Sequence, residues 1–175
     1  DFDIDLIHHY SLTVHAFDPT PYSEEWISTL ELPSNFQFHA WAAAGKDGVL
    51  RLYRRINKRG RKSNVMWTAD NKAGDAADFV DVPAFTLRTM MRKLGHYRID
   101  LLKVDIEGAE YDILDGLPEM ERLPVQLLVE FHHRFPGIGK RRTVESIEKL
   151  RKLGYVIASI SETGREVSFV LKHAV

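Results

Sequence analysis

Hydrophobic and polar positions along the chain follow two alternating periods, one typical of strands and one typical of helices. Apolar runs of strand length are followed by segments whose apolar residues recur every three or four positions. This alternation favours an α/β fold with a parallel sheet covered by helices on both faces. The pattern predicts strands at 12–18, 36–43, 100–105 and 126–132, helices at 23–30, 86–94 and 142–153, and a hairpin of strands 155–161 and 166–172 at the end of the chain.

The alternation fails in the middle of the chain, between about residues 46 and 81. Residues 49–56 show period-two patterning with basic side chains on one side, and residues 63–69 can pair with them as a hairpin or edge ribbon. Residues 71–81 are rich in Ala, Asp and Gly, and this composition predicts a loop. We expect a basic β-ribbon and loop inserted at about 46–81 in one domain spanning 1–175.

Composition fits one soluble domain and excludes several classes of protein. The chain has 175 residues, 44% of them hydrophobic and 28% charged, which suffices for one core and not for two ordinary domains. No apolar run approaches the ~18 residues of a membrane span, so we expect a cytoplasmic protein without such a span. The absence of cysteine excludes disulfides, zinc thiolate sites and cysteine nucleophiles, and a net charge of -1 gives no strong nucleic-acid signal.

Three carboxylates follow the predicted strand at 100–105. Asp105 ends the strand, Glu107 precedes the break at Gly108, and Glu110 opens the next helical segment. Acids near a helix start can simply favour its positive end, which would explain Glu107 and Glu110 without any function. That interpretation leaves out Asp105, because an acid in an apolar strand end costs free energy unless something binds it.

These residues carry a resemblance to a known family. The string from Lys103 to Glu110, Lys-Val-Asp-Ile-Glu-Gly-Ala-Glu, resembles the signature of the FkbM-type methyltransferases, which use S-adenosylmethionine. The string from Val14 to Pro21, Val-His-Ala-Phe-Asp-Pro-Thr-Pro, is similar to the segment that ends the second strand in that family. The resemblance covers the chain from Phe2 to about Val170 and is weakest across the predicted insertion.

The resemblance implies a Rossmann-like class I methyltransferase sheet that is mostly parallel and ends in a C-terminal antiparallel hairpin. Such a sheet opens with a strand and a glycine-rich turn that receives the methionine end of the cofactor. This chain starts instead with a segment that resembles the helix after that turn, so the first strand and the turn are missing. We expect the natural protein to begin earlier, because losing a central strand would leave two strand edges unpaired.

The resemblance also implies which residues bind S-adenosylmethionine. Asp18, followed by Pro19, stands where a strand-end carboxylate accepts the ribose hydroxyls, although an Asp before proline also initiates turns. Ala42 and Ala43 close a strand beside the expected adenine, although small residues there can also serve close packing. Asp105 completes the predicted cofactor set.

Glu130 and His132 end the next strand after Asp105, and neighbouring parallel strands end at one edge of a sheet. His132 is a candidate general base because imidazole titrates near neutral pH, although a structural histidine would explain it equally well. Asp105 with Glu130 or His132 could instead hold a divalent cation, but the absence of a compact ligand motif favours a metal-free route. We predict Asp105, Glu107 and His132 as catalytic, Glu110, Glu130 and Trp67 as substrate contacts, and no metal.

The strongest block of charge lies in the predicted insertion. It could bind an anionic acceptor or a nucleic acid, but a solvated or lid-like ribbon is favoured because only Tyr53 and Trp67 could stack on bases. In that interpretation Met66 and Trp67 are apolar lid contacts. The block consists of Arg51, Arg54, Arg55, Lys58, Arg59, Arg61 and Lys62.

Together these features predict an S-adenosylmethionine-dependent methyltransferase that methylates a hydroxyl of a sugar or other small metabolite. A lipid, protein or RNA acceptor is the alternative among enzymes. A non-catalytic interaction domain of the same fold is the alternative from another class. The expected partner is a small hydroxylated acceptor, whose identity, like the oligomeric state, the sequence does not indicate.

Overall fold

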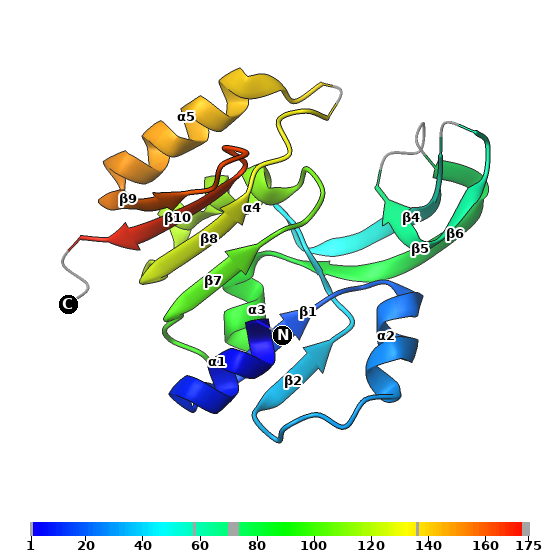
Figure 1. Ribbon diagram of the computed structural model, residues 1–175, viewed down its shortest axis with the longest axis horizontal. Coiled ribbons are helices and arrows are strands. Elements are labelled where there is room, and N and C mark those ends of the chain that lie inside the picture. Colours follow the sequence, from blue (N-terminus) through cyan, green and yellow to red (C-terminus); the bar gives the residue numbers. More distant parts are fainter. Residues whose placement is uncertain (1, 58, 70–73, 136, 173–175) are drawn as a thin grey trace. The chain divides into compact units, whose positions relative to one another are not determined.

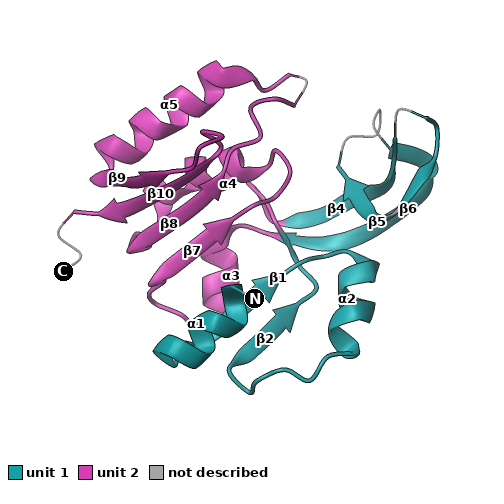
Figure 2. Ribbon diagram, in the orientation of Figure 1, with its two compact units in different colours: residues 1–42, 48–84 teal, residues 43–47, 85–175 magenta. Residues whose placement is uncertain are grey.

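A computed structural model describes residues 2–57, 59–69, 74–135 and 137–172 of the chain (Figure 1). The chain divides into two compact units, one of residues 1–42 and 48–84 and the other of residues 43–47 and 85–175 (Figure 2). Lys58 of the basic block and residues 71–73 of the predicted loop lie outside the described residues.

The first unit begins with a helix and a pair of parallel strands. β1 and β2 pair from Val14 opposite Phe36 to Phe17 opposite His39, and α1 packs on both strands. Thr20 caps the next helix by accepting the Ser23 N–H, as a hydroxyl before a helix start does. The elements are α1 (Phe2–Tyr10), β1 (Val14–Phe17), α2 (Pro21–Ser28) and β2 (Phe36–His39).

A second sheet has the order β3-β6-β4-β5, with β4 antiparallel to both β5 and β6. The predicted ribbon is confirmed, but the loop predicted at 71–81 is wrong, because residues from Gly74 onward form a long strand. Val80 and Val82 face the same side of this strand, and Asp81 between them pairs with a basic side chain across the sheet. The strands are β3 (Ala42–Ala43), β4 (Gly48–Ile56), β5 (Lys62–Thr68) and β6 (Gly74–Phe85).

The second unit contains a four-stranded sheet of order β7-β8-β10-β9. β7 and β8 are parallel, whereas β10 is antiparallel to both β8 and β9, so the sheet is mixed rather than mostly parallel. The predicted C-terminal hairpin is confirmed as β9 and β10. The elements are α3 (Leu87–Leu94), β7 (Leu101–Val104), α4 (Glu110–Gly116), the 3-10 helix η1 (Leu117–Glu119), β8 (Gln126–Glu130), α5 (Gly139–Lys152), β9 (Tyr155–Ile160) and β10 (Glu166–Leu171).

The core of the second unit lies between this sheet and its helices α4 and α5 (Figure 1). Its leucines and aromatics come from alternate positions of β8 and β10 and from one side of each helix, as period-two and period-3.6 patterns require. α5 ends before Gly154, whose φ of 100° turns the chain into β9. Among the described residues, no helix is long and apolar enough to cross a membrane. The core residues are Tyr111, Leu114, Leu117, Leu127, Val129, Phe131, Leu150, Tyr155, Val167 and Phe169.

Candidate functional site

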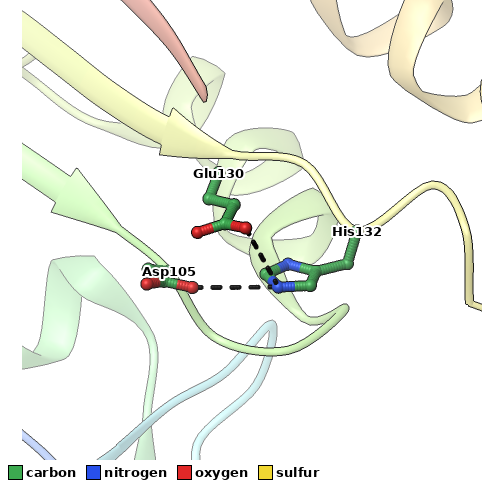
Figure 3. Close-up of side chains that lie close together, drawn as sticks. All are labelled: Asp105, Glu130 and His132. Atoms are coloured by element: carbon green, nitrogen blue, oxygen red, sulfur yellow. Dashed lines mark ion pairs between the residues drawn. The ribbon is translucent and has the colours of Figure 1, made fainter. Parts of the chain in front are cut away.

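The parallel register of β7 and β8 brings two carboxylates and a histidine to one edge of the sheet. Val104 lies opposite Val129, so Asp105, which follows β7, and Glu130, the last residue of β8, come next at the same edge of the sheet. His132 lies two residues after the end of β8. Figure 3 shows both carboxylates pointing toward the His132 ring. We call Asp105, Glu130 and His132 the rim cluster.

The atoms of the rim cluster face one another without touching. His132 Nε2 lies 3.8 Å from Asp105 Oδ1 and 4.0 Å from Glu130 Oε1. One ligand atom from each of the three residues lies within 4.8 Å of the other two. These separations exceed hydrogen-bond length, so the three groups enclose a gap that a proton donor or a cation can enter.

His132 is the buried member of the rim cluster. Its side chain is only 8% exposed, and its ring lies 5.1 Å from that of Phe135, centroid to centroid. Nδ1 has no hydrogen-bond partner in the described part of the chain and lies 3.5 Å from Glu110 Oε1. Nδ1 therefore faces Glu110, and Nε2 faces Asp105 and Glu130 on the other side of the ring.

Glu110 fixes the two loops that carry the rim cluster. Its side chain is fully buried, Oε1 accepts a hydrogen bond from the backbone N–H of His132 at 2.7 Å, and Oε2 accepts one from Gly108 at 2.8 Å. Glu110 thus joins the loop after β7 to the loop after β8. A direct contact with substrate, as expected from the sequence, would require this carboxylate to give up one of these bonds.

The loop between β7 and α4 has a backbone conformation that few side chains adopt. Glu107 has φ 52° and Gly108 has φ 104°, both in the left-handed region. A Cβ at Gly108 would lie 3.1 Å from Ile138, so this position combines a strained backbone with close packing. The two residues turn the chain sharply enough to bring Glu110 back under His132, and the Glu107 side chain is left exposed.

The two carboxylates of the rim cluster differ in their exposure to solvent, and Asp105 is not buried as expected from the sequence. The Asp105 side chain is 41% exposed and that of Glu130 is 22% exposed. Asp105 is therefore not buried in an apolar strand end, and the carboxylate that burial isolates is Glu110. Two cations attenuate the negative charge, since Lys103 Nζ lies 4.0 Å from Asp105 and Arg165 lies 3.3 Å from Glu130.

In the first unit, Asp18 follows β1 and anchors the start of α2. Its Oδ1 accepts the Thr20 N–H at 2.8 Å, and its Oδ2 accepts the Ser23 hydroxyl at 2.6 Å. Both bonds belong to the turn into the helix, which is the structural interpretation of this residue. A carboxylate can accept about four hydrogen bonds, so two further acceptor positions remain on these oxygens.

The other predicted contact residues occupy β3 and β5. Ala42 is buried and Ala43 partly buried where β3 ends. Trp67 is partly buried, with the Arg54 guanidinium 4.7 Å from the centre of its ring. Its indole Nε1 is buried without a hydrogen-bond partner among the described residues.

Aspartates of β6 neutralise much of the basic ribbon. Arg51 pairs with Asp81 through two hydrogen bonds of 2.6 and 2.7 Å, and Arg54 bonds to Asp78 at 3.0 Å. These hydrogen bonds, which Arg51 donates and Asp81 accepts, raise the pKa of Arg51 and lower the pKa of Asp81. Each of these two arginines therefore has an acidic partner on the neighbouring strand.

Comparison with known proteins places these features in context. The family model described as the methyltransferase FkbM domain matches residues 5–157. AMB antimetabolite synthetase AmbE of Pseudomonas aeruginosa is 29% identical over 66% of this chain and 6% of its own length. Methyltransferase sdnD of Sordaria araneosa is 40% identical over 37% of the chain and 26% of its own length.

A third relative is the probable methyltransferase-like protein 24 of Homo sapiens, 37% identical over 29% of this chain and 14% of its own length. The chain thus spans between 6% and 26% of the length of these curated relatives. No solved structure matches the chain.

Proposed function

The chain belongs to the FkbM methyltransferase family, and we propose that it uses S-adenosylmethionine to methylate a hydroxyl group of a sugar or other small metabolite. The observation that carries this proposal is the rim cluster, in which Asp105, Glu130 and His132 meet at the carboxyl ends of two parallel strands. Ligand sites of open α/β sheets lie at such edges. The mixed sheet of the second unit, ending in the β9–β10 hairpin, is consistent with a class I methyltransferase domain that includes the whole chain.

Asp18 is the proposed ribose contact. Its carboxylate is fixed by Thr20 and Ser23, so it loses little side-chain entropy on binding a ligand, and it keeps acceptor positions for hydroxyl donors. Pro19 restricts the backbone beside it. Ala42 and Ala43 are proposed to lie beside the adenine, where their small side chains would admit a planar base.

The cofactor supplies an activated methyl group when bound, so the protein has to orient the acceptor and remove its proton. In our proposal this occurs at the rim cluster. Nε2 of His132 faces the two carboxylates, and Glu110 accepts the backbone N–H of His132. His132 can take the proton itself, or it can share a cation with Asp105 and Glu130 that makes the hydroxyl more acidic. Glu107, exposed on the adjacent strained loop, is proposed to contact the acceptor.

A small acceptor is consistent with the name of one relative, which describes that relative as an antimetabolite synthetase. We favour a small acceptor over RNA because Arg51 and Arg54 of the ribbon are paired with aspartates of β6. Trp67, under the Arg54 guanidinium, then serves as a lid contact for a small molecule rather than as a base-stacking platform.

The proposal is tested by methyl transfer in the natural full-length protein. Methyl-labelled S-adenosylmethionine is incubated with a panel of sugars and hydroxylated metabolites, and labelled product is identified by mass spectrometry. We expect one methyl group per acceptor, lost from O-blocked acceptors and strongly reduced in Asp105→Asn. Glu119→Gln, which changes an exposed carboxylate on η1, is the matched control. Label recovered in O-blocked rather than nitrogen-blocked acceptors would contradict O-methylation.

A further inference from the structure

We propose that the rim cluster binds one divalent metal ion of the Mn²⁺ type, with Asp105, Glu130 and His132 as its protein ligands. The binding itself is read from the geometry of these side chains. Only the catalytic role of the ion rests on the proposed function.

The separations between the donor atoms fit a shared ion. Three atoms within 4.8 Å of one another, two of the separations being 3.8 and 4.0 Å, have a common point about 2.3–2.5 Å from each. This is a few tenths of an ångström more than the bonds of about 2.0–2.2 Å that such metals form with nitrogen and oxygen ligands. The same separations are too long for hydrogen bonds between the groups, so small side-chain movements would bring all three onto one ion.

His132 gives the observation that distinguishes the rim cluster from an ordinary group of acids. It is 8% exposed, and its Nε2 faces Asp105 at 3.8 Å and Glu130 at 4.0 Å, too far for a hydrogen bond to either. An ion between these atoms would give the buried Nε2 a direct ligand bond that neither carboxylate supplies. Nδ1 lies on the opposite side of the ring, 3.5 Å from the buried Glu110 carboxylate.

The chemical type of the three ligand atoms indicates which metal ion would bind. One imidazole nitrogen with two carboxylate oxygens suits Mn²⁺, Fe²⁺ or Zn²⁺ better than Ca²⁺ or Mg²⁺, which prefer oxygen ligands alone. Asp105 is 41% exposed, so the open side of the ion is accessible to water or an acceptor hydroxyl. Arg165, 3.3 Å from Glu130, opposes cation binding and sets a limit on its affinity.

The catalytic consequence is an acidified acceptor. An ion held by Asp105, Glu130 and His132 would lower the pKa of an acceptor hydroxyl beside it, so that the hydroxyl proton could pass to water. Methyl transfer would then form the bond from the acceptor oxygen to carbon as the sulfur–methyl bond breaks, with that electron pair left on sulfur. In this mechanism His132 orients the ion and does not take the proton.

The test is titration of the full-length protein with Mn²⁺ alone, followed by the electron paramagnetic resonance signal of free Mn²⁺ and by calorimetry. We expect one site per chain, weakened at least about tenfold in Asp105→Asn, Glu130→Gln and His132→Gln. Arg165→Gln should tighten binding by about threefold or more, because it removes a cation beside Glu130. Glu119→Gln should bind like the unchanged protein.

Several results would overturn the proposal. Free Mn²⁺ that stays unbound at millimolar concentration in folded protein would do so, as would binding that Asp105→Asn leaves unaltered. Asp105 is exposed, so this variant is expected to fold even where His132→Gln does not. Mn²⁺ binding without binding of S-adenosylmethionine would refute the proposed function and support the metal site. Mn²⁺ binding with methyl transfer that survives chelation would refute the catalytic role of the ion.

Discussion

Replacing Glu110 should destabilise the second unit more than any other change to a single carboxylate in the site. Glu110→Ala removes both acceptors of the Gly108 and His132 backbone N–H groups, of which the bond from His132 is buried and the bond from Gly108 part-buried. Hydrogen bonds to a charged group contribute about 1.5–3 kcal/mol each, so the two together predict a loss of about 3–6 kcal/mol. Domains are stable by about 5–15 kcal/mol, which makes this a large fraction of the total.

Glu110→Gln removes one hydrogen-bond acceptor while nearly preserving the volume of the side chain. Its amide keeps one oxygen for one N–H and presents an NH₂ group to the other, so we expect a loss of about 1.5–3 kcal/mol, the contribution of one bond. Glu119→Gln on the exposed 3-10 helix should change the free energy of unfolding by less than about 0.5 kcal/mol.

The assay combines urea unfolding followed by circular dichroism with amide hydrogen exchange. In Glu110→Ala the amides of Gly108 and His132 should lose protection before the core strands do, because their acceptor is gone. The reasoning would be refuted by an alanine variant with unchanged midpoint and unchanged protection at these two amides. A glutamine variant as unstable as the alanine variant would show that charge, rather than the number of acceptors, decides the outcome.

Two further predictions concern neighbouring carboxylates. Asp105→Asn and Glu107→Gln should lower turnover far more than melting temperature, because both side chains are exposed; a large drop in melting temperature with turnover retained would return them to a structural role. Partial burial acts to raise the pKa of Asp115, but hydrogen bonds from Lys149 and Arg142 outweigh it and hold that pKa below its usual 3.8. Asp115→Asn should therefore cost about 1 kcal/mol at neutral pH, a difference that disappears as the pH falls through the lowered pKa and that thermal unfolding at several pH values would measure.

Sequence reasoning located the elements with strong periodicity and failed where tertiary pairing outweighs local preference. The β9–β10 hairpin and the strand before Asp105 follow directly from alternating apolar runs. β6 was missed because Ala, Asp and Gly disfavour strands, whereas its aspartates gain ion pairs with Arg51 and Arg54 that only the folded sheet provides.

The same limit applies to the site. The sequence identified Asp105, Glu130 and His132 singly, but their common gap depends on the register of β7 and β8, which no local motif contains. Glu110 was expected to contact substrate, although its spacing of three, four and seven residues from Ile113, Leu114 and Leu117 places it on the buried side of its helix. That helical spacing is the feature of the sequence that predicts a buried Glu110.

The account depends most directly on binding of S-adenosylmethionine, which calorimetry on the full-length protein measures without knowledge of the acceptor. We predict saturable binding at one site per chain, competed by S-adenosylhomocysteine. Asp18→Asn should weaken it by about 1–3 kcal/mol, because the amide keeps an oxygen for the Thr20 N–H but replaces one ribose acceptor by a donor. Absence of binding by folded protein at millimolar cofactor would contradict the account. Unchanged affinity in Asp18→Asn would remove that residue from the cofactor site.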